Sequence, residues 1–241
     1  MIVNTSGIVF HHLNYSESGI IAKIYTERFG LQSFMVKGVR RKKSRMRMNL
    51  FGPLSLVDIV MDYKEKYTLH HLRDISSAYP FTGITTDIRR SSLAIFINEL
   101  LNKSIQGEEP DPALFTYIVD TVKYLDSTTD RLGSFHLQVA MELTHFLGFR
   151  PHDNFSSSCR FFDLQEGAFI SSIPLHPYCL DETLSGYWHQ LLLQSAFQPD
   201  TEEWSATLRD TLLNKVLDYY RLHLPGFREM KSPEVLKEVL H

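Results

Sequence analysis

The segment Ile20-Ile21-Ala22-Lys23-Ile24-Tyr25-Thr26 decides the fold of the first third of the chain. β-Branched and aromatic residues dominate it, which is the composition of a β-strand. Arg28-Phe29-Gly30 then turns the chain, and residues 31–39 form a second strand with its side chains on alternating faces. The two strands therefore predict the centre of a small β-domain.

Further strands lie on both sides of this pair. Residues 8–10 begin one strand, residues 54–63 form a long one, and residues 67–72 form the last. Short turns separate them, among them the polar segments at 15–19 and 64–66. Five strands in fewer than 80 residues predict a small closed barrel such as the OB-fold. A small sandwich or an SH3-like barrel would give nearly the same pattern.

The second strand leads into a segment that we call the basic run, residues 37–47. Seven of its eleven residues are basic and none is acidic, although the whole chain carries a net charge of −3. Its cations are Lys37, Arg40, Arg41, Lys42, Lys43, Arg45 and Arg47. Like charges this close together need water or an anionic partner, and a phosphate backbone is the natural partner. A solvated charge run or a targeting signal is the alternative.

The hydrophobic period changes near residues 78–83, which predicts a barrel domain at 1–80 and a mostly α-helical domain at 81–241. Apolar positions from Ile84 to Ile105, including Ile88 and Ile95, predict one helix buried on much of its circumference. Further helices are expected at 114–125, 132–147, 187–195, 208–220 and from Ser232 to the end.

The ends of the third helix and the segment that follows it carry their own signals. Residues 127–130 offer N-caps for this helix, and Gly148 ends it. Residues 152–181 are irregular, with 161–162 and 168–170 as short hairpin strands around Gly167.

Composition bounds the class of protein. The 241 residues are 43% hydrophobic and 22% charged, as in an ordinary folded soluble protein. No apolar run approaches the ~20 residues that span a bilayer, and Met1 to Ser6 lack the features of a signal peptide. Two cysteines are too few for a disulfide framework. We therefore expect a cytoplasmic, nucleoid-associated protein with no membrane contact.

The basic run resembles a known family. Lys37-Gly38-Val39-Arg40-Arg41-Lys42-Lys43-Ser44 after a short barrel is similar to a segment of RecO, a family of bacterial recombination mediators. Further marks of the family agree in order: Ser18-Gly19, Tyr25-Thr26, Phe29-Gly30, Asn98-Glu99-Leu100-Leu101, Phe135-His136-Leu137 and Leu147-Gly148-Phe149-Arg150-Pro151. The resemblance extends to about residue 180.

The resemblance implies an OB-fold followed by a helical domain, with a role in DNA repair and no enzymatic activity or small-molecule substrate. The family binds single- and double-stranded DNA, anneals complementary strands, engages the C-terminal tail of single-strand-binding protein (SSB), and with RecR helps load RecA. On this view the cations of the basic run hold phosphates and Lys23 adds charge. Tyr25 and Phe34 could stack on bases, but we favour a place in the barrel core.

The chain departs from the family at a metal site. Family members often carry a CxxC…CxxC zinc site where this chain has Cys159-Arg160-Phe161-Phe162 and His176-Pro177-Tyr178-Cys179. Cys159, His176 and Cys179 are thus three possible ligands, and His152 or Asp163 would have to supply a fourth. We expect a degenerate site with apolar packing in place of zinc, and no cofactor.

Two other functions are open. In one, the chain is mainly a scaffold whose helical domain binds the SSB tail in a pocket rimmed by Arg131, Arg150 and Lys215, with DNA binding secondary. In the other, Asp58 and Asp62, which share one strand face, serve a metal-dependent nuclease. A solvent-facing strand surface is the favoured interpretation of that pair.

Overall fold

The computed structural model describes residues 1–40, 46–64, 66–198 and 204–240. The chain divides into two compact units, Met1–Ser127 and Thr128–His241. The strands of the first unit end at Ser77 and its helices begin at Gly83. The change from strands to helices therefore falls inside the first unit, which holds a barrel and three helices.

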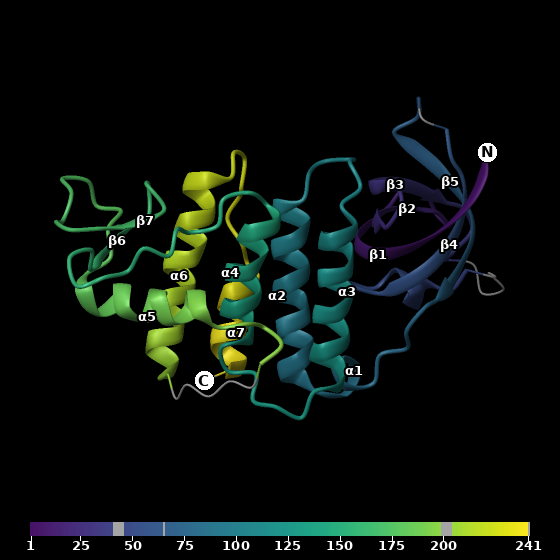
Figure 1. Cartoon of the computed structure of the whole chain (residues 1–241). Coiled ribbons are helices and arrows are strands. Elements are labelled where there is room, and N and C mark those ends of the chain that lie inside the picture. The colour runs from purple at the N-terminus through teal and green to yellow at the C-terminus, as the bar shows by residue number, and fades with distance from the viewer. Residues whose placement is uncertain (41–45, 65, 199–203, 241) are drawn as a thin grey trace. The chain divides into compact units, whose positions relative to one another are not determined.

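The barrel contains five strands, which curve around a common core (Figure 1). They are β1 (Ile2–Asn14), β2 (Ile20–Thr26), β3 (Gly30–Val36), β4 (Leu56–Asp62) and β5 (Leu69–Ser77). Their closed order is β1-β2-β3-β5-β4, and every pairing is antiparallel except that of β3 with β5. This confirms the predicted small closed barrel of the OB type.

The contact between β3 and β5 that closes the barrel is short. Its register pairs are Ser33–Leu69, Phe34–His70 and Met35–His71. Side chains reinforce it: Nε2 of His70 lies 3.0 Å from Oε1 of Gln32, and the ring of His70 stacks on that of Tyr63. His70 is 3% exposed, so this hydrogen bond is shielded from water and holds the two strands together.

The barrel core follows from strand alternation. In β3 every second residue is buried, as expected for a strand with one face inward. Phe34 is fully buried in this core, as predicted. Val39 and Phe51 join the same cluster, although neither belongs to a strand. The basic run is therefore anchored in the barrel through Val39 near its start and through Phe51 just after its end.

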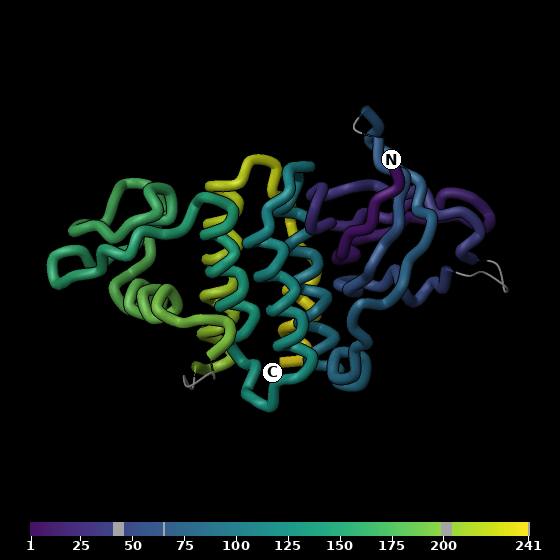
Figure 2. Tube along the Cα trace, turned by 45° about the vertical axis from the view of Figure 1, so that its right-hand side comes forward, coloured from purple at the N-terminus to yellow at the C-terminus, as the bar shows by residue number. Residues whose placement is uncertain are grey.

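Three helices complete the first unit, and α2 and α3 run side by side (Figures 1 and 2). They are α1 (Gly83–Thr86), α2 (Ile88–Ser104) and α3 (Pro112–Ser127). Nδ2 of Asn98 donates to the backbone oxygen of Phe10 at 2.9 Å, and the ring of Phe115 lies 6.2 Å from that of Tyr25. Tyr25 is 1% exposed, but it packs beneath these helices on the outer side of β2 and is not part of the barrel core. Its predicted burial is therefore confirmed, and its predicted place inside the barrel is wrong.

The expected single helix from residue 84 to residue 105 is wrong. Asp87 has an extended backbone and its side chain accepts a hydrogen bond from the backbone N of Arg89 at 2.8 Å, so it starts α2 as an N-cap. The wide buried stripe is also wrong in part, because Ile88 and Ile95 are 69% and 46% exposed.

Asp126 holds the segment that leads from the barrel to the helices. This buried carboxylate accepts hydrogen bonds from the backbone N of Ile84 at 2.8 Å and of Thr82 at 3.1 Å, and from the hydroxyl of Tyr79 at 3.3 Å. Nη1 of Arg90 donates to the backbone oxygen of Asp126 at 2.8 Å. These bonds satisfy polar groups at the start of α1 and at the end of α3, which fixes the two helices to each other.

The second unit is helical with one small hairpin. Its elements are α4 (Phe135–Phe146), β6 (Phe161–Asp163), β7 (Ala168–Ile170), α5 (Glu182–Leu193), α6 (Ala206–His223) and α7 (Ser232–Leu240). The predicted hairpin around Gly167 is confirmed, and Gly148 follows α4 with a φ of +81° as expected for a helix end. Among the residues of the two units that the structure describes, no helix has the length and apolar character to span a membrane.

The predicted N-cap of the third long helix is wrong. Ser127 belongs to α3, where its hydroxyl donates to the backbone oxygen of Lys123 at 2.9 Å. Thr128 accepts from the backbone N of Asp130 at 3.1 Å and forms a local turn. α4 begins later, at Phe135. Hydroxyl side chains here satisfy nearby backbone groups rather than start a helix.

Gly30→Ala should destabilise the first unit. Gly30 has a φ of +61°, and a Cβ there would collide with the backbone oxygens of Glu108 and Glu109. Strain and overpacking together should cost about 2–5 kcal/mol. Gly148→Ala is the control, because it has positive φ but open space around it, and should cost only about 1–2 kcal/mol. Chemical unfolding followed by circular dichroism gives both losses, and equal losses would contradict the close approach.

His136 should make the second unit sensitive to acid. Burial, and then the charge of Arg209, lower the pKa of His136 from 6.5 to about 3. Below pH 6.5 the unfolded chain takes up a proton that the folded chain does not, so stability falls as pH falls towards 3. Between pH 7 and pH 5 this should remove about 2 kcal/mol. His136→Gln should abolish that part of the slope.

The exposed His152 provides the control, since His152→Gln should leave the slope unchanged. Denaturation followed by tryptophan fluorescence measures this unit alone, because both tryptophans, Trp188 and Trp204, belong to it. An unaltered slope for His136→Gln would show that the histidine is not kept neutral by the fold.

Candidate nucleic-acid interface

The start of the basic run alternates between solvent and core. Lys37 is exposed, Gly38 has a φ of +71°, Val39 is 3% exposed and Arg40 is exposed again. The positive φ reverses the chain after β3, a conformation that glycine adopts at little cost. The Lys-Gly-Val-Arg pattern therefore places two cations outside the barrel while one valine anchors them.

Arg40 is also bonded to the loop between β1 and β2. Its backbone N donates to the backbone oxygen of Ser18 at 3.2 Å, and its Nη1 donates to that of Ser16 at 3.4 Å. The loop is held by its own bonds: the backbone N of Tyr15 donates to the oxygen of Gly19 at 3.1 Å. The first cations of the run are thus positioned against a folded loop.

The other end of the run is anchored by the short helix η1 (Met48–Phe51). Phe51 is fully buried in the barrel, and Arg47 directly before the helix is exposed. Of the predicted phosphate contacts, Lys37, Arg40 and Arg47 are therefore exposed near two anchored points. The predicted sites Arg41, Lys42, Lys43 and Arg45 lie outside the described residues.

The open face of the barrel continues from this segment. The register sets Leu13 beside Ile21, Ile21 beside Met35, and Met35 beside His71. All four belong to the side of the strands that points away from the core, and each is at least partly exposed. The loops from β1 to β2 and from β4 to β5 flank this face, as they flank the ligand face in OB-folds.

Lys23 adds charge to the same face. It is exposed and lies between His11 and Ser33 in the register. Burial, then the neighbouring His12 and Lys23, lower the pKa of His11 below its ordinary value. The lowered pKa favours the neutral form of His11, so Lys23 supplies the positive charge at this point.

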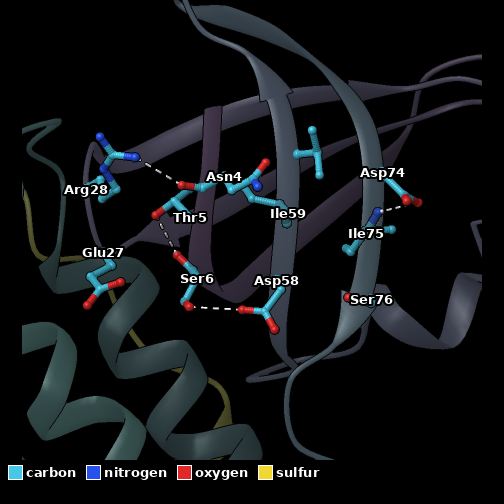
Figure 3. A pocket seen from close by; sticks show the side chains of 11 residues that line it. Asn4, Thr5, Ser6, Glu27, Arg28, Asp58, Ile59, Asp74, Ile75 and Ser76 are labelled. Atoms are coloured by element: carbon cyan, nitrogen blue, oxygen red, sulfur yellow. Dashed lines mark hydrogen bonds between the residues drawn. The ribbon is translucent and has the colours of Figure 1, made fainter. Parts of the chain in front are cut away.

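A pocket of about 430 Å³ on another part of the barrel has the opposite character (Figure 3). Carboxylates of Glu27, Asp58 and Asp74 line it, and Arg28 is the one basic residue among the described residues of its lining. The hydroxyl of Ser6 donates to Asp58 at 3.0 Å. Three carboxylates repel phosphate, so this surface is unsuited to DNA and leaves the open face as the candidate interface.

The aspartates of the nuclease hypothesis are engaged separately. Asp62 accepts from Nε of Arg73 at 2.7 Å, and this contact lowers the pKa of Asp62. Asp58 and Asp62 are four residues apart on β4, which separates them by about 13 Å. Two carboxylates so far apart cannot bind one metal ion together, so the arrangement does not support a nuclease site.

The three possible zinc ligands do not form a closed site. Nε2 of His176 lies 3.1 Å from Oδ2 of Asp163, and the thiol of Cys179 donates to the backbone oxygen of Leu180 at 3.5 Å. Burial, then the Asp163 carboxylate, raise the pKa of the Cys179 thiol, which disfavours the thiolate that binds metal. No group of three histidine, cysteine or acidic residues in the described part of the chain is placed to hold a metal ion.

Aromatic packing occupies the place of the missing cysteine. Phe162 is fully buried, and its ring lies 4.9 Å from those of both Phe169 and Trp188. Its backbone N donates to the hydroxyl of Ser185 at 2.8 Å. These contacts tie the hairpin to α5 through a hydrophobic core.

The three basic residues proposed for a partner pocket belong to different segments of the second unit. Arg131 precedes α4 and Arg150 follows it, and the 12 residues of that helix separate them by about 18 Å. Lys215 lies on α6, with Nζ 3.9 Å from Oδ2 of Asp218. The pocket rimmed by these three residues therefore stays a prediction.

Sequence reasoning missed Tyr15, which it assigned to a polar turn. The structure places this residue, 61% exposed, beside Met35 and Lys37 at the start of the basic run. An aromatic residue in the first loop of an expected OB-fold was a signal that could have identified it.

The fold places the chain among proteins that join an N-terminal barrel of the OB type to a helical region. The family model described as "Recombination protein O N terminal" matches residues 1–81, and "Recombination protein O C terminal" matches residues 85–233. The chain therefore belongs to the Recombination protein O, or RecO, family, as the resemblance indicated.

Several relatives match over almost the whole chain. The DNA repair protein RecO of Phocaeicola vulgatus is 34% identical over 240 residues, and that of Flavobacterium psychrophilum is 35% identical over 241 residues. Each match covers 99% of both chains. The protein is accordingly a DNA repair protein of the RecO family, which is not a class of enzymes.

Phe162→Ala should destabilise the second unit by about 3–5 kcal/mol, because it leaves a cavity between the hairpin and α5. Cys159→Ser at the first cysteine of the degenerate motif should change stability by less than about 0.5 kcal/mol. Elemental analysis of the purified protein should find no stoichiometric zinc, and a chelator should leave the unfolding midpoint in place. Stoichiometric zinc, or unfolding by the chelator, would refute this prediction.

Proposed function

We propose that this protein binds single- and double-stranded DNA through the basic run and the open barrel face, and that it anneals complementary strands. The observation that carries the proposal is the placement of Lys37, Arg40 and Arg47. These exposed cations lie next to residues buried in the barrel. Cations held at fixed positions lose little conformational entropy when a phosphate binds.

Binding of this kind is independent of sequence. Lysine and arginine neutralise phosphates and release condensed counterions, which gives affinity without reading base edges. Two strands bound in this way repel each other less and remain able to search for register. Annealing is therefore a consequence of charge screening and requires no covalent chemistry.

Membership of the RecO family supports a role as a recombination mediator. We propose that the protein acts with RecR to load RecA onto DNA coated with SSB, in the cytoplasm and associated with the nucleoid. Contact with the SSB C-terminal tail belongs to this proposal, as does the alternative that such protein contacts are the main activity and DNA binding is secondary.

Charge reversal tests the DNA-binding proposal. Replacement of Arg40, Arg41, Lys42 and Lys43 by Glu should abolish binding to an oligonucleotide and abolish annealing. For the unaltered protein, the logarithm of affinity should fall linearly with the logarithm of salt concentration, by about 0.7 for each single-strand phosphate contacted. Fluorescence anisotropy over a salt series measures both quantities.

A matched variant controls for net charge. Arg89, Lys123, Arg160 and Arg228 are exposed cations outside the barrel, and their reversal to Glu changes the charge by the same amount. This variant should retain most of the affinity. If both variants bind and anneal equally well, the basic run has no part in the mechanism.

A further inference from the structure

A pocket of about 450 Å³ lies between the β1–β2 loop and the end of β3. This volume is within the range of about 300–1,000 Å³ typical of small-ligand sites. Its lining residues include Tyr15, Ser16, Ser18, Met35, Lys37 and Gly38. None of the described lining residues is acidic, in contrast to the pocket that contains Asp58.

The loop presents the ring of Tyr15 to solvent. Hydrogen bonds inside the loop fix its backbone, since the N of Gly19 donates to the hydroxyl of Ser16 at 2.9 Å. Tyr15 nevertheless remains 61% exposed. An aromatic ring on a loop with a fixed backbone offers a large apolar face, which suits a flat partner.

The residues around Tyr15 indicate which kind of ligand the pocket would bind. Met35 supplies a thioether, which packs well against aromatic rings. Lys37 supplies a cation at the rim and is exposed, and Arg40 is bonded to the same loop through Ser18. An aromatic face, an apolar side and a cation together match a nucleotide, with its flat base and its phosphate.

We propose that Tyr15 stacks on an unpaired base of single-stranded DNA while Lys37 holds an adjacent phosphate. The proposal rests on the DNA binding proposed above and assigns the site its substrate preference. In the interior of a duplex, each base is covered on both faces by its neighbours, so a long duplex offers the ring only the outer faces of its two terminal pairs. The cations serve both forms of DNA, and Tyr15 adds affinity for single strands alone.

Substitution of Tyr15 tests the proposal. Tyr15→Ala should weaken binding of an oligo-dT strand by about 5- to 150-fold, the range for loss of one stacked base. It should leave the affinity for a blunt duplex and the salt dependence of binding unchanged. Tyr15→Phe should restore single-strand affinity, because the ring remains. Tyr178→Ala, which removes an exposed tyrosine of the second unit, is the matched control.

A spectroscopic variant gives an independent signal. The natural tryptophans Trp188 and Trp204 are 0% and 6% exposed, so they are shielded from DNA bases. In Tyr15→Trp, oligo-dT should quench the new exposed tryptophan, and a blunt duplex should not. Quenching by both forms of DNA, or by neither, would contradict stacking on an unpaired base.

The two proposals fail in different ways. If the unaltered protein binds no DNA at low ionic strength, the proposed function is overturned and this inference with it. If it binds both forms and Tyr15→Ala binds as the unaltered protein does, or weakens both forms equally, the stacking role of Tyr15 is overturned while DNA binding stands.

Discussion

The buried hydrogen bond between Gln32 and His70 secures the contact on which the barrel depends. The antiparallel pairing of β1 with β4 has seven register pairs, whereas the parallel pairing of β3 with β5 has three. If the short pairing of β3 with β5 opened, backbone groups of both strands would lose their hydrogen-bond partners. The ring of His70 covers this pairing, because it packs against the rings of Tyr63 and Phe34. Closure of the barrel also places Met35 of β3 beside His71 of β5. The outward side chains of these strands therefore form one continuous open face. The candidate interface is therefore a product of barrel closure and not of the basic run alone.

The same register separates the charges of the first unit. Helices α2 and α3 cover the outer side of the barrel around Phe10 and Tyr25, where an aromatic ring of α3 and an amide of α2 complete the packing. Of the remaining outer surface, the open face carries Lys23 and the pocket carries Asp58 and Asp74, while Asp62, which pairs with His71 at the edge of the open face, is bonded to Arg73. A polyanion approaching the barrel thus has one favourable side, and its orientation follows from which strands carry which charges.

Most of the architecture was predictable from the sequence, because the spacing of hydrophobic residues and the presence of turn residues are local properties of the chain. Five strands, the long helices of both units and the hairpin around Gly167 were predicted from them, whereas the short helix α1 was not separated from α2. The predictions failed where a contact between distant or capping residues determined the local structure. Asp87 interrupts an otherwise continuous apolar pattern with a cap, and Ile88 is apolar yet exposed. The aromatic residue in the first loop was the one local signal for Tyr15, and its neighbours Met35 and Lys37 were not predictable because they are some twenty residues away and reach it through the pairing of β2 with β3. The charge of the basic run was evident from composition, but its anchoring through Val39 required the core.

A chain with a net charge of −3 can bind a polyanion because electrostatic attraction in salt is local. At physiological ionic strength the Debye length is about 8 Å, so acidic residues elsewhere on the surface would be screened from a strand at the proposed interface. What matters is the density of cations within that distance of a phosphate, and seven of the eleven residues in the basic run are basic. Stacking on an exposed aromatic ring is short-ranged and largely independent of salt. A surface that combines the two can gather any strand by charge and retain the unpaired ones by contact with their bases.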